Sequence, residues 1–338
     1  MGQIKILFMK KILILGANSF AGTSFVNYLL KKKYKVFSTS RSYEKKDPFN
    51  IYKENINKQN YKFNRIDINK KNDLNKLKMI IVKNKIKLIV DFGSQSMVGQ
   101  SWETPEDWVR TNCLGKLNLV RELCKIKNIK YIRISTPEVY GNNNNKIKEN
   151  DKILPSTPYA ITQATADFFT FAYTKFRGLN SITLRFANFY GPGQQLFRII
   201  PKTIISILKG KKLNIHGDGS SLRSFIFPDD FCESILLAIK KGKRNEVYNI
   251  SPSREISIIN LVKIICNMMN YDKNKLVVFS KDRIGKDLRY MMSSKKAKKE
   301  LGWHSKISLE NGLKKTIHWY IGNFKKLNKL KSIYIHKK

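Results

Sequence analysis

Short apolar runs alternate with longer amphipathic segments through the first half of the chain. The run from Lys11 to Leu15 has the length and composition of a strand buried in a parallel sheet, and apolar residues recur at helical spacing from Phe20 to Lys32. A second helical pattern covers Asp107 to Ile126. Further strands are predicted at Lys35 to Ser38, Lys62 to Ile66, Leu88 to Phe92, Tyr131 to Ser135 and Ser181 to Phe186. Strands that alternate with helices in this way predict an α/β fold built on a doubly wound parallel sheet.

The pattern changes after Tyr190, where the predicted elements become shorter. Glycine-rich turns separate them at Gly191 to Gly193 and at Gly217 to Gly219. We therefore expect residues 9–190 to form the sheet-containing unit, with some later strands and helices returning to it. Residues 191–322 should form mainly a smaller C-terminal lobe.

The two ends of the chain carry weaker signals. Met9 is a candidate start residue beside Met1, because the first strand begins just after it. Residues 323–338 form a basic tail, and their spaced apolar residues predict a solvated terminal helix rather than a membrane anchor. No apolar run reaches the length of a membrane span.

The composition is that of a folded protein with an unusual charge. Of the 338 residues, 42% are hydrophobic, while 65 Lys and Arg against 25 Asp and Glu leave a net charge of +40. The lysines are spread through every predicted element instead of forming one stripe interleaved with aromatic residues. This spread argues against a nucleic-acid partner. A basic surface still attracts an anionic substrate.

The cysteines give no sign of a metal centre or of a disulfide framework. Cys113, Cys124, Cys232 and Cys266 lie far apart, without the paired spacing of zinc ligands. Unpaired cysteines are typical of a reducing compartment, so we expect a cytoplasmic protein without a metal ion.

The turn after the first strand has the spacing of a dinucleotide-binding fingerprint. Gly16 and Gly22 are its outer glycines, and Ser19 stands where the middle glycine is usual. Gly16 lets the chain turn tightly, while the helix amino end, with Asn18 and Phe20 in the turn, offers unpaired N–H groups to a pyrophosphate. A glycine turn without a ligand is the alternative. The position between a strand and a helix favours a Rossmann-type cofactor site.

The second and third strands end on residues that bear on the choice of cofactor. An NAD enzyme usually has an acidic residue after the second strand, but Ser40 and Arg41 stand there. Arg41 favours a 2′-phosphate and hence NADP over NAD, unless it is a solvent-facing charge. Asp67 and the following Ile68 are also assigned to the cofactor site, Asp67 as an acceptor for the adenine amino group. The alternative for Asp67 is a simple loop cap.

Several segments together resemble the extended short-chain dehydrogenase/reductases, and most closely the nucleotide-sugar 4,6-dehydratases. The resemblance runs in the expected order from about Lys11 to Trp303. Its segments are Phe92 to Ser96, Ser135 to Gly141, Pro158 to Gln163, Asn188 to Gly193, Gly217 to Gly219 and Arg223 to Phe225.

The resemblance implies a reaction and a set of catalytic residues. Tyr159 would take the proton from the sugar O4, helped by Thr136, while hydride leaves C4 for the nicotinamide. Glu138 would then remove the C5 proton as water departs from C6, and the hydride would return to C6. Beside Tyr159, the residues that the resemblance assigns to the cofactor are Phe92, Gly93, Ser94 and Gln163.

Two positions depart from the pattern of these dehydratases. Gln163 stands where the family's Tyr-x-x-x-Lys motif has its lysine, so the motif supplies no cation to lower the pKa of Tyr159. A neutral hydrogen bond contributes only about 1 kcal/mol, which predicts slow hydride transfer unless another cation substitutes. Pro137 replaces an aspartic acid that protonates the departing water in the thymidine-diphosphate-glucose enzymes. Thr136, Glu138 or a bound water remain as donors.

The substrate side follows from the same resemblance. Asn188, Arg223 and Arg283 are expected to hold a nucleotide diphosphate, because two guanidinium groups suit a pyrophosphate. Gln95 and Ser96 are expected to line the sugar pocket together with Thr136.

The resemblance also implies a homodimer and leaves other functions open. The helices containing Asp107 to Ile126 and Tyr159 to Lys175 would pair across the dimer. An epimerase or a decarboxylase of the same family is one alternative to the dehydratase. A catalytically impaired nucleotide-sugar-binding protein is another, suggested by Gln163 and Pro137 together.

Overall fold

A seven-stranded parallel sheet forms the centre of the computed structural model, which describes residues 11–44, 48–55, 58–282, 284–285 and 287–336. The strand order is β12-β7-β5-β4-β1-β2-β3, and all neighbouring strands are parallel. The strands are β1 (Lys11–Leu15), β2 (Lys35–Ser40), β3 (Tyr61–Arg65), β4 (Leu88–Asp91), β5 (Lys130–Ser135), β7 (Asn180–Phe186) and β12 (Val247–Ile250). The predicted doubly wound Rossmann-type sheet is confirmed.

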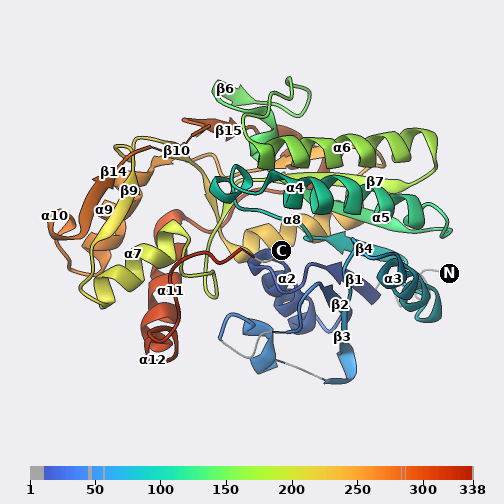
Figure 1. Cartoon of the computed structure of the whole chain (residues 1–338), viewed down its shortest axis with the longest axis horizontal. Coiled ribbons are helices and arrows are strands. Elements are labelled where there is room, and N and C mark those ends of the chain that lie inside the picture. The colour runs from blue at the N-terminus through green and yellow to red at the C-terminus, as the bar shows by residue number, and fades with distance from the viewer. Residues whose placement is uncertain (1–10, 45–47, 56–57, 283, 286, 337–338) are drawn as a thin grey trace.

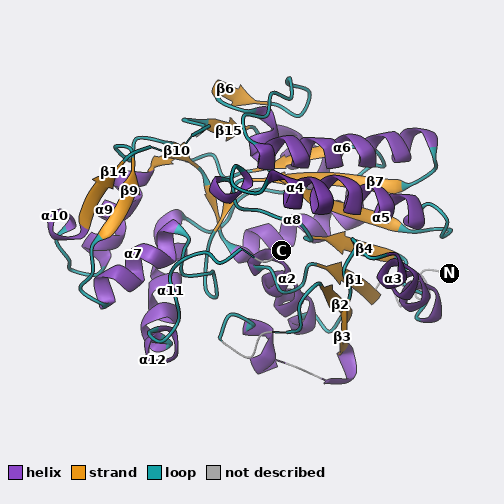
Figure 2. Cartoon of the chain, viewed as in Figure 1, coloured by secondary structure: helices purple, strands orange, loops and turns teal. Residues whose placement is uncertain are grey.

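Both faces of the sheet are buried, as the apolar runs predict. In β1, Ile12 and Ile14 belong to one core cluster while Leu13 and Leu15 belong to another, because successive side chains point to opposite faces. The helices α2 (Phe20–Lys31) and α8 (Pro228–Lys241) cover the first face. The helices α3 (Lys71–Lys83), α5 (Lys116–Leu123) and α6 (Pro158–Phe176) cover the second (Figures 1 and 2).

The helix predicted over Asp107 to Ile126 forms without a break as far as Leu123, but it is not a regular α-helix throughout. The short helix α4 (Pro105–Trp108) is followed by a wider π-helical turn over residues 109–115, and only then by α5. In this turn the buried Asn112 side chain exchanges two hydrogen bonds with the main chain of Gln95, at 2.9 and 3.0 Å. The wider turn therefore ties this segment to the loop that follows β4.

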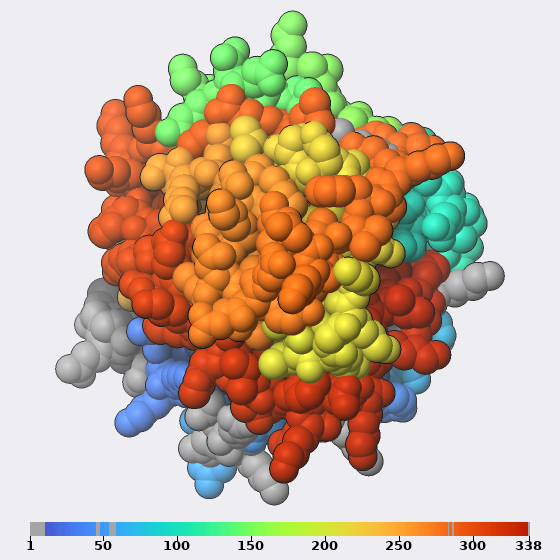
Figure 3. All heavy atoms as spheres, turned by 90° about the vertical axis from the view of Figure 1, so that its left-hand side faces the viewer, coloured from blue at the N-terminus to red at the C-terminus, as the bar shows by residue number. Residues whose placement is uncertain are grey.

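The C-terminal lobe has a hydrophobic core of its own, which includes Ile204, Leu261 and Leu313. Its helices are α7 (Ile199–Leu208), α9 (Ile258–Met268), α10 (Lys273–Leu276) and α11 (Leu309–Gly322). Its two-stranded sheets pair β9 (Leu213–His216) with β14 (Val277–Ser280) and β10 (Leu222–Arg223) with β13 (Ile256–Ser257). Two further pairs, β8 (Asn188–Phe189) with β11 (Phe225–Ile226) and β6 (Asn143–Ile147) with β15 (Tyr290–Met292), join segments from both halves of the chain. In the view facing the lobe, its surface is mainly yellow, orange and red, so late segments build it (Figure 3).

The solvated terminal helix predicted for the tail is wrong. Among the described residues of the tail, α12 (Phe324–Leu327) is the only helix, and the chain then runs back toward the sheet-containing unit (Figure 1). The ring of Tyr334 packs edge-on against Phe197, and His336 stacks on Trp108 with ring centroids 5.0 Å apart. His336 Nε2 also lies 2.7 Å from Asp107 Oδ2. These aromatic and polar contacts hold the end of the tail against α4.

Candidate active site

The turn between β1 and α2 has the close backbone approach that a dinucleotide requires. Gly16 has a φ of +74°, and a Cβ there would lie 2.5 Å from the Gly93 nitrogen. A Cβ on Gly22 would collide with the Gly16 carbonyl oxygen. Ser19 caps α2, since its Oγ accepts from Gly22 N at 3.0 Å and donates to Gly16 O at 2.7 Å. Ser19 thus explains how the fingerprint tolerates the loss of its middle glycine.

Polar groups at the ends of β2 and β3 surround the same turn. Asn18 Nδ2 donates to Ser42 O and Tyr43 O, both at 2.9 Å, while Asn18 Oδ1 is buried without a hydrogen-bond partner among the described residues. Ser40 ends β2 and Arg41 follows it, and Arg65 Nε donates to Arg41 O at 3.0 Å. The glycine cradle and the unpaired Asn18 oxygen fit a dinucleotide.

Asp67 and Ile68 lie in the loop after β3. Asp67 Oδ1 accepts from Asn69 N at 3.0 Å, so this carboxylate caps the loop. Ile68 lies against Gly115, where a Cβ would come within 3.2 Å of its side chain. This hydrogen bond agrees with the interpretation of Asp67 as a loop cap.

The loop after β4 is held from both sides. Phe92 N donates to Leu15 O at 2.9 Å, and Gly93 N donates to Asp91 Oδ1 at 2.8 Å. Gln95 is buried, whereas the flanking Ser94 and Ser96 are exposed. These residues follow the carboxyl end of a central strand, where ligands bind in doubly wound sheets.

Thr136, Glu138 and Tyr159 are brought together from two elements. Thr136 follows β5 and caps the short helical turn that carries Glu138, while Tyr159 lies in the first turn of α6, capped by Thr157. Burial raises the pKa of Tyr159 well above 10, and the negative charge of Glu138 raises it further. A hydrogen bond with Thr136 and the charge of Arg198 lower it. Without bound ligands the phenol is therefore protonated at neutral pH.

Arg198 is a site residue that the sequence analysis missed. It directly precedes α7 in the C-terminal lobe, and burial lowers its pKa while Tyr159, Glu138 and Tyr290 raise it. A charged residue directly before the apolar run 199–208 was the available signal. Arg198 brings a cation from the second lobe to the catalytic groups.

The predicted substrate residues form a group next to the same site. Arg223 lies over the ring of Tyr290, 4.2 Å from its centroid, and its Nη2 donates to Asp287 O at 2.7 Å. Burial raises the pKa of Tyr290, and hydrogen bonding with Asn188 lowers it. The negative charge of Glu138 also raises the pKa of Tyr290, so the two side chains lie near each other. Arg283 lies outside the described residues, as do Met1 and Met9.

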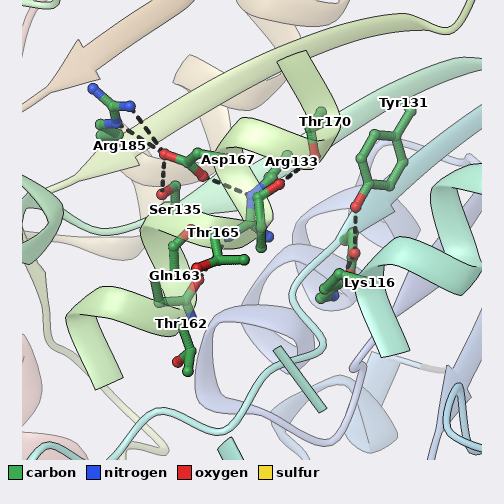
Figure 4. Close-up of polar contacts among 12 residues, drawn as sticks. Lys116, Tyr131, Arg133, Ser135, Thr162, Gln163, Thr165, Asp167, Thr170 and Arg185 are labelled. Carbon is green, nitrogen blue, oxygen red and sulfur yellow. Dashed lines mark hydrogen bonds and ion pairs between the residues drawn. The ribbon is translucent and has the colours of Figure 1, made fainter. Parts of the chain in front are cut away.

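Gln163 lies in a buried network with Arg133, Asp167 and Arg185 (Figure 4). Its Oε1 accepts from Arg133 Nη2 at 2.8 Å, and Arg133 Nε donates to Asp167 Oδ1 at 2.7 Å. Asp167 Oδ2 accepts from Arg185 Nη2 and from Ser135 Oγ, both at 3.0 Å. We call Arg133, Asp167 and Arg185 the arginine cluster. Burial opposes charge on both arginines, but Asp167 raises their pKa values, so both stay charged.

A second buried group, the lysine cluster, comprises Asp91, Lys116 and Tyr131 (Figure 4). Lys116 Nζ and Tyr131 Oη both lie 2.5 Å from Asp91 Oδ2. Burial lowers the pKa of Lys116, and the charge of Asp91 opposes that shift. The sequence analysis predicted neither cluster.

The described part of the chain holds no group of three or more His, Cys, Asp or Glu side chains arranged for a metal ion. Among the described residues, no helix combines the length and the apolar character needed to cross a membrane. All four cysteines are free thiols.

Comparisons with known proteins point to one family. The model of the GDP-mannose 4,6-dehydratase family matches residues 13–316. The human dTDP-D-glucose 4,6-dehydratase is 34% identical over 274 residues, which cover 79% of this chain and 77% of the human one. A trifunctional UDP-glucose 4,6-dehydratase/epimerase/reductase of Arabidopsis thaliana is 33% identical over 322 residues, 93% of this chain but 47% of that protein. The chain thus spans about half the length of such plant relatives.

A solved structure agrees in fold. The dTDP-glucose 4,6-dehydratase of Streptomyces venezuelae, solved with NAD and TDP bound, superposes with a TM-score of 0.86 at 28% identity. The match covers 93% of this chain and 97% of that one. The nucleotide-sugar dehydratase segments expected from the sequence lie within the matched regions. The chain belongs to the GDP-mannose 4,6-dehydratase family of nicotinamide-dependent nucleotide-sugar enzymes.

Proposed function

We propose that this protein is a nucleotide-hexose 4,6-dehydratase, which converts its substrate into a 4-keto-6-deoxy sugar nucleotide. The observation that carries the proposal is the convergence of Thr136, Glu138 and Tyr159 in one buried site. A dehydratase needs one group for the O4 proton and a second for the C5 proton. A phenol and a carboxylate within electrostatic reach of each other supply both.

In the first half of the reaction, Tyr159 takes the proton from O4 while hydride leaves C4. The bound nicotinamide supplies the hydride acceptor and a positive charge, which opposes the upward shift of the Tyr159 pKa. Thr136 holds the phenol by its hydrogen bond, and Arg198 adds a second positive charge. Burial of Tyr159 excludes water from the proton it moves.

In the second half, Glu138 removes the C5 proton, which the C4 ketone has made acidic. Breaking of the C6–O bond would release water. Hydride held on the bound nicotinamide would return to C6 and a proton would be added back to C5, which gives CH at C5 and a methyl group at C6. Tyr159 would return the proton that it took from O4 only in the reverse reaction, so the product of the forward reaction keeps its C4 ketone. The departing water needs a proton, for which Thr136 and Glu138 are the candidate donors, and the proton that Tyr159 took from O4 makes up the balance.

We assign the cofactor to the turn 16–22 and the loop 92–94. Ser40 and Arg41 support NADP, and Arg65 at the end of β3 adds a second guanidinium beside them. The NAD held by solved relatives supports NAD. Comparing the dissociation constants of NAD and NADP decides between them, and Arg41→Ala should weaken NADP binding selectively if a 2′-phosphate is recognised.

Asn188 and Arg223, with Arg283 from outside the described residues, are assigned to the nucleotide diphosphate. Gln95 and Ser96 are assigned to the sugar pocket. The free cysteines are the basis for predicting a cytoplasmic location. A homodimer is supported by exposed apolar side chains on α6 and the preceding π-helical turn, of which Phe168 is 56% exposed and Leu114 is 55% exposed. Light scattering that gives only the monomer mass would contradict the dimer.

Product mass spectrometry tests the function. Purified protein is incubated with GDP-, TDP-, UDP- and CDP-hexoses and either cofactor, and we expect loss of water from one of them. Glu138→Gln should lower that product by at least about a hundredfold, because it removes a general base. A mass-neutral conversion would instead identify an epimerase, which does not need Glu138. Loss of carbon dioxide from a uronic acid would identify a decarboxylase, and tight binding without conversion would identify an impaired binding protein.

A further inference from the structure

We propose that Arg133 is a positioning residue: it fixes the orientation of the Gln163 amide so that Gln163 Nε2 is presented as a hydrogen-bond donor to the nicotinamide half of the bound cofactor. The inference rests on the proposed function, and it concerns the position at which this chain departs from its family. It assigns a role to a strand residue that no motif of the sequence includes.

The first step is the orientation of the amide. A glutamine side chain has an acceptor oxygen and a donor nitrogen on the same carbon, and the two exchange places by a half-turn. A guanidinium has only donors, so only the oxygen can face it. Arg133 Nη2 lies 2.8 Å from Gln163 Oε1 and 3.1 Å from the Gln163 carbonyl oxygen. Nε2 therefore occupies the branch of the amide that points away from Arg133.

The second step is that Arg133 itself cannot turn. Its Nε donates to Asp167 Oδ1 at 2.7 Å, and Arg185 and Ser135 engage the other carboxylate oxygen. Arg133 is 1% exposed and Asp167 is 5% exposed. The Asp167 carboxylate therefore fixes the Arg133 guanidinium, and Arg185 on β7 and Ser135 on β5 in turn fix the carboxylate.

The third step is the face on which the donor is presented. Tyr159 and Gln163 lie four residues apart in α6, so their side chains emerge one above the other on the same face of the helix. Gln163 is 2% exposed, which leaves its N–H groups within the protein rather than in bulk water. A buried amide donor is costly to leave without an acceptor. A hydroxyl or amide oxygen of a bound dinucleotide is the acceptor class that fits.

Cofactor affinity in four variants tests the inference, with NAD and NADP as probes and calorimetry as the measurement. Gln163→Glu keeps an acceptor for Arg133 and the shape of the side chain but removes the N–H donor. We expect the dissociation constant to rise about tenfold or more. Gln163→Met separates loss of the donor from the added charge, and it should also weaken binding about tenfold.

Arg133→Lys and Arg185→Lys form a matched pair. Each keeps one positive charge next to Asp167, but only Arg133 contacts Gln163. We expect Arg133→Lys to weaken cofactor binding about fivefold and Arg185→Lys to change it less than twofold, although both lower the melting temperature. If Arg133→Lys does not fold, the two Gln163 variants carry the test.

The outcomes separate this inference from the proposed function. Equal affinities for the two lysine variants, or an unchanged affinity in Gln163→Glu, would overturn the role of Arg133 even if dehydration is observed. Failure of the wild-type protein to bind either cofactor would overturn it as well. The expected affinities without any loss of water from a nucleotide-hexose would leave the inference standing and defeat the dehydratase.

Discussion

The lysine cluster and the arginine cluster lie on the same sheet, and both are buried, but they differ in charge and in reach (Figure 4). In the lysine cluster, one cation meets one carboxylate, and the only outward bond of Asp91 among the described residues goes to Gly93 N. The arginine cluster has two cations for one carboxylate. It extends to Gln163 and to Ser135, the residue before Thr136. Arg133 also acts on Lys116 and Tyr131, so the two clusters are coupled, but only the arginine cluster contacts Gln163 and Ser135.

Burying excess charge is costly, and a protein retains it where it has a use. The arginine cluster places a permanent positive charge behind the helix turn that carries Tyr159. Arginine suits this place better than lysine, because a guanidinium does not lose its proton on burial. Lys116 at the start of α5 shows the opposite behaviour, because burial lowers its pKa.

Removing each carboxylate gives the largest expected difference between the clusters. Asp167→Asn removes the carboxylate that pairs with both buried guanidinium groups and leaves Arg133 only the negative charge of Asp91, so we expect the free energy of unfolding at pH 7 to fall by about 3–5 kcal/mol. Asp91→Asn leaves only the Lys116 cation, so we expect roughly half that loss. Urea denaturation with equal m-values in both variants measures the difference. Equal losses would mean that the excess positive charge of the arginine cluster does not change the free energy of unfolding.

The same pair of variants should differ in its response to pH. In Asp91→Asn, the pKa of Lys116 falls further below its usual 10.5, because the carboxylate that raised it is gone. Between that lowered value and 10.5 the unfolded chain binds more protons than the folded one. Stability should therefore rise with pH, by up to about 1.4 kcal/mol per unit.

Asp167→Asn should show no recovery beyond that of the wild-type protein, because it keeps Asp91 beside Lys116 and arginine stays protonated over this range. Urea denaturation repeated between neutral and alkaline pH, with the wild-type protein as the reference, measures both slopes. A recovery in Asp167→Asn as steep as that in Asp91→Asn would break the distinction between the clusters.

The local parts of the site could be predicted from the sequence. Strand β1 occupies the predicted Lys11–Leu15, and α2 begins at the predicted Phe20, because apolar spacing and a glycine turn are local signals. The segments of Thr136, Glu138 and Tyr159 were found by resemblance, and the fold brings them together. The π-helical turn before α5 was not predicted, because it depends on the contact of Asn112 with a distant loop.

The arginine cluster could not be predicted because its contacts join residues 18 to 34 positions apart. Strands β5 (Lys130–Ser135) and β7 (Asn180–Phe186) each contain one arginine directly flanked by apolar residues. Arginine is almost never buried without a partner, so two such residues in central strands signal a buried carboxylate nearby. The sequence leaves open which acidic residue that is, and the fold identifies Asp167.

The smallest expected effect compares two hydroxyl groups on the same strand. Tyr131 donates to Asp91 in the lysine cluster, and Ser135 donates to Asp167 in the arginine cluster. Tyr131→Phe and Ser135→Ala each remove one such bond, and each should cost about 1 kcal/mol of stability. Only Ser135→Ala also loosens the segment that leads into Thr136, so only this variant should lower kcat, by about fivefold, with KM little changed. Steady-state kinetics on the nucleotide-hexose that the wild-type protein converts measures this. If both variants lower kcat equally, the lysine cluster also positions the catalytic groups, and the two clusters differ in charge alone.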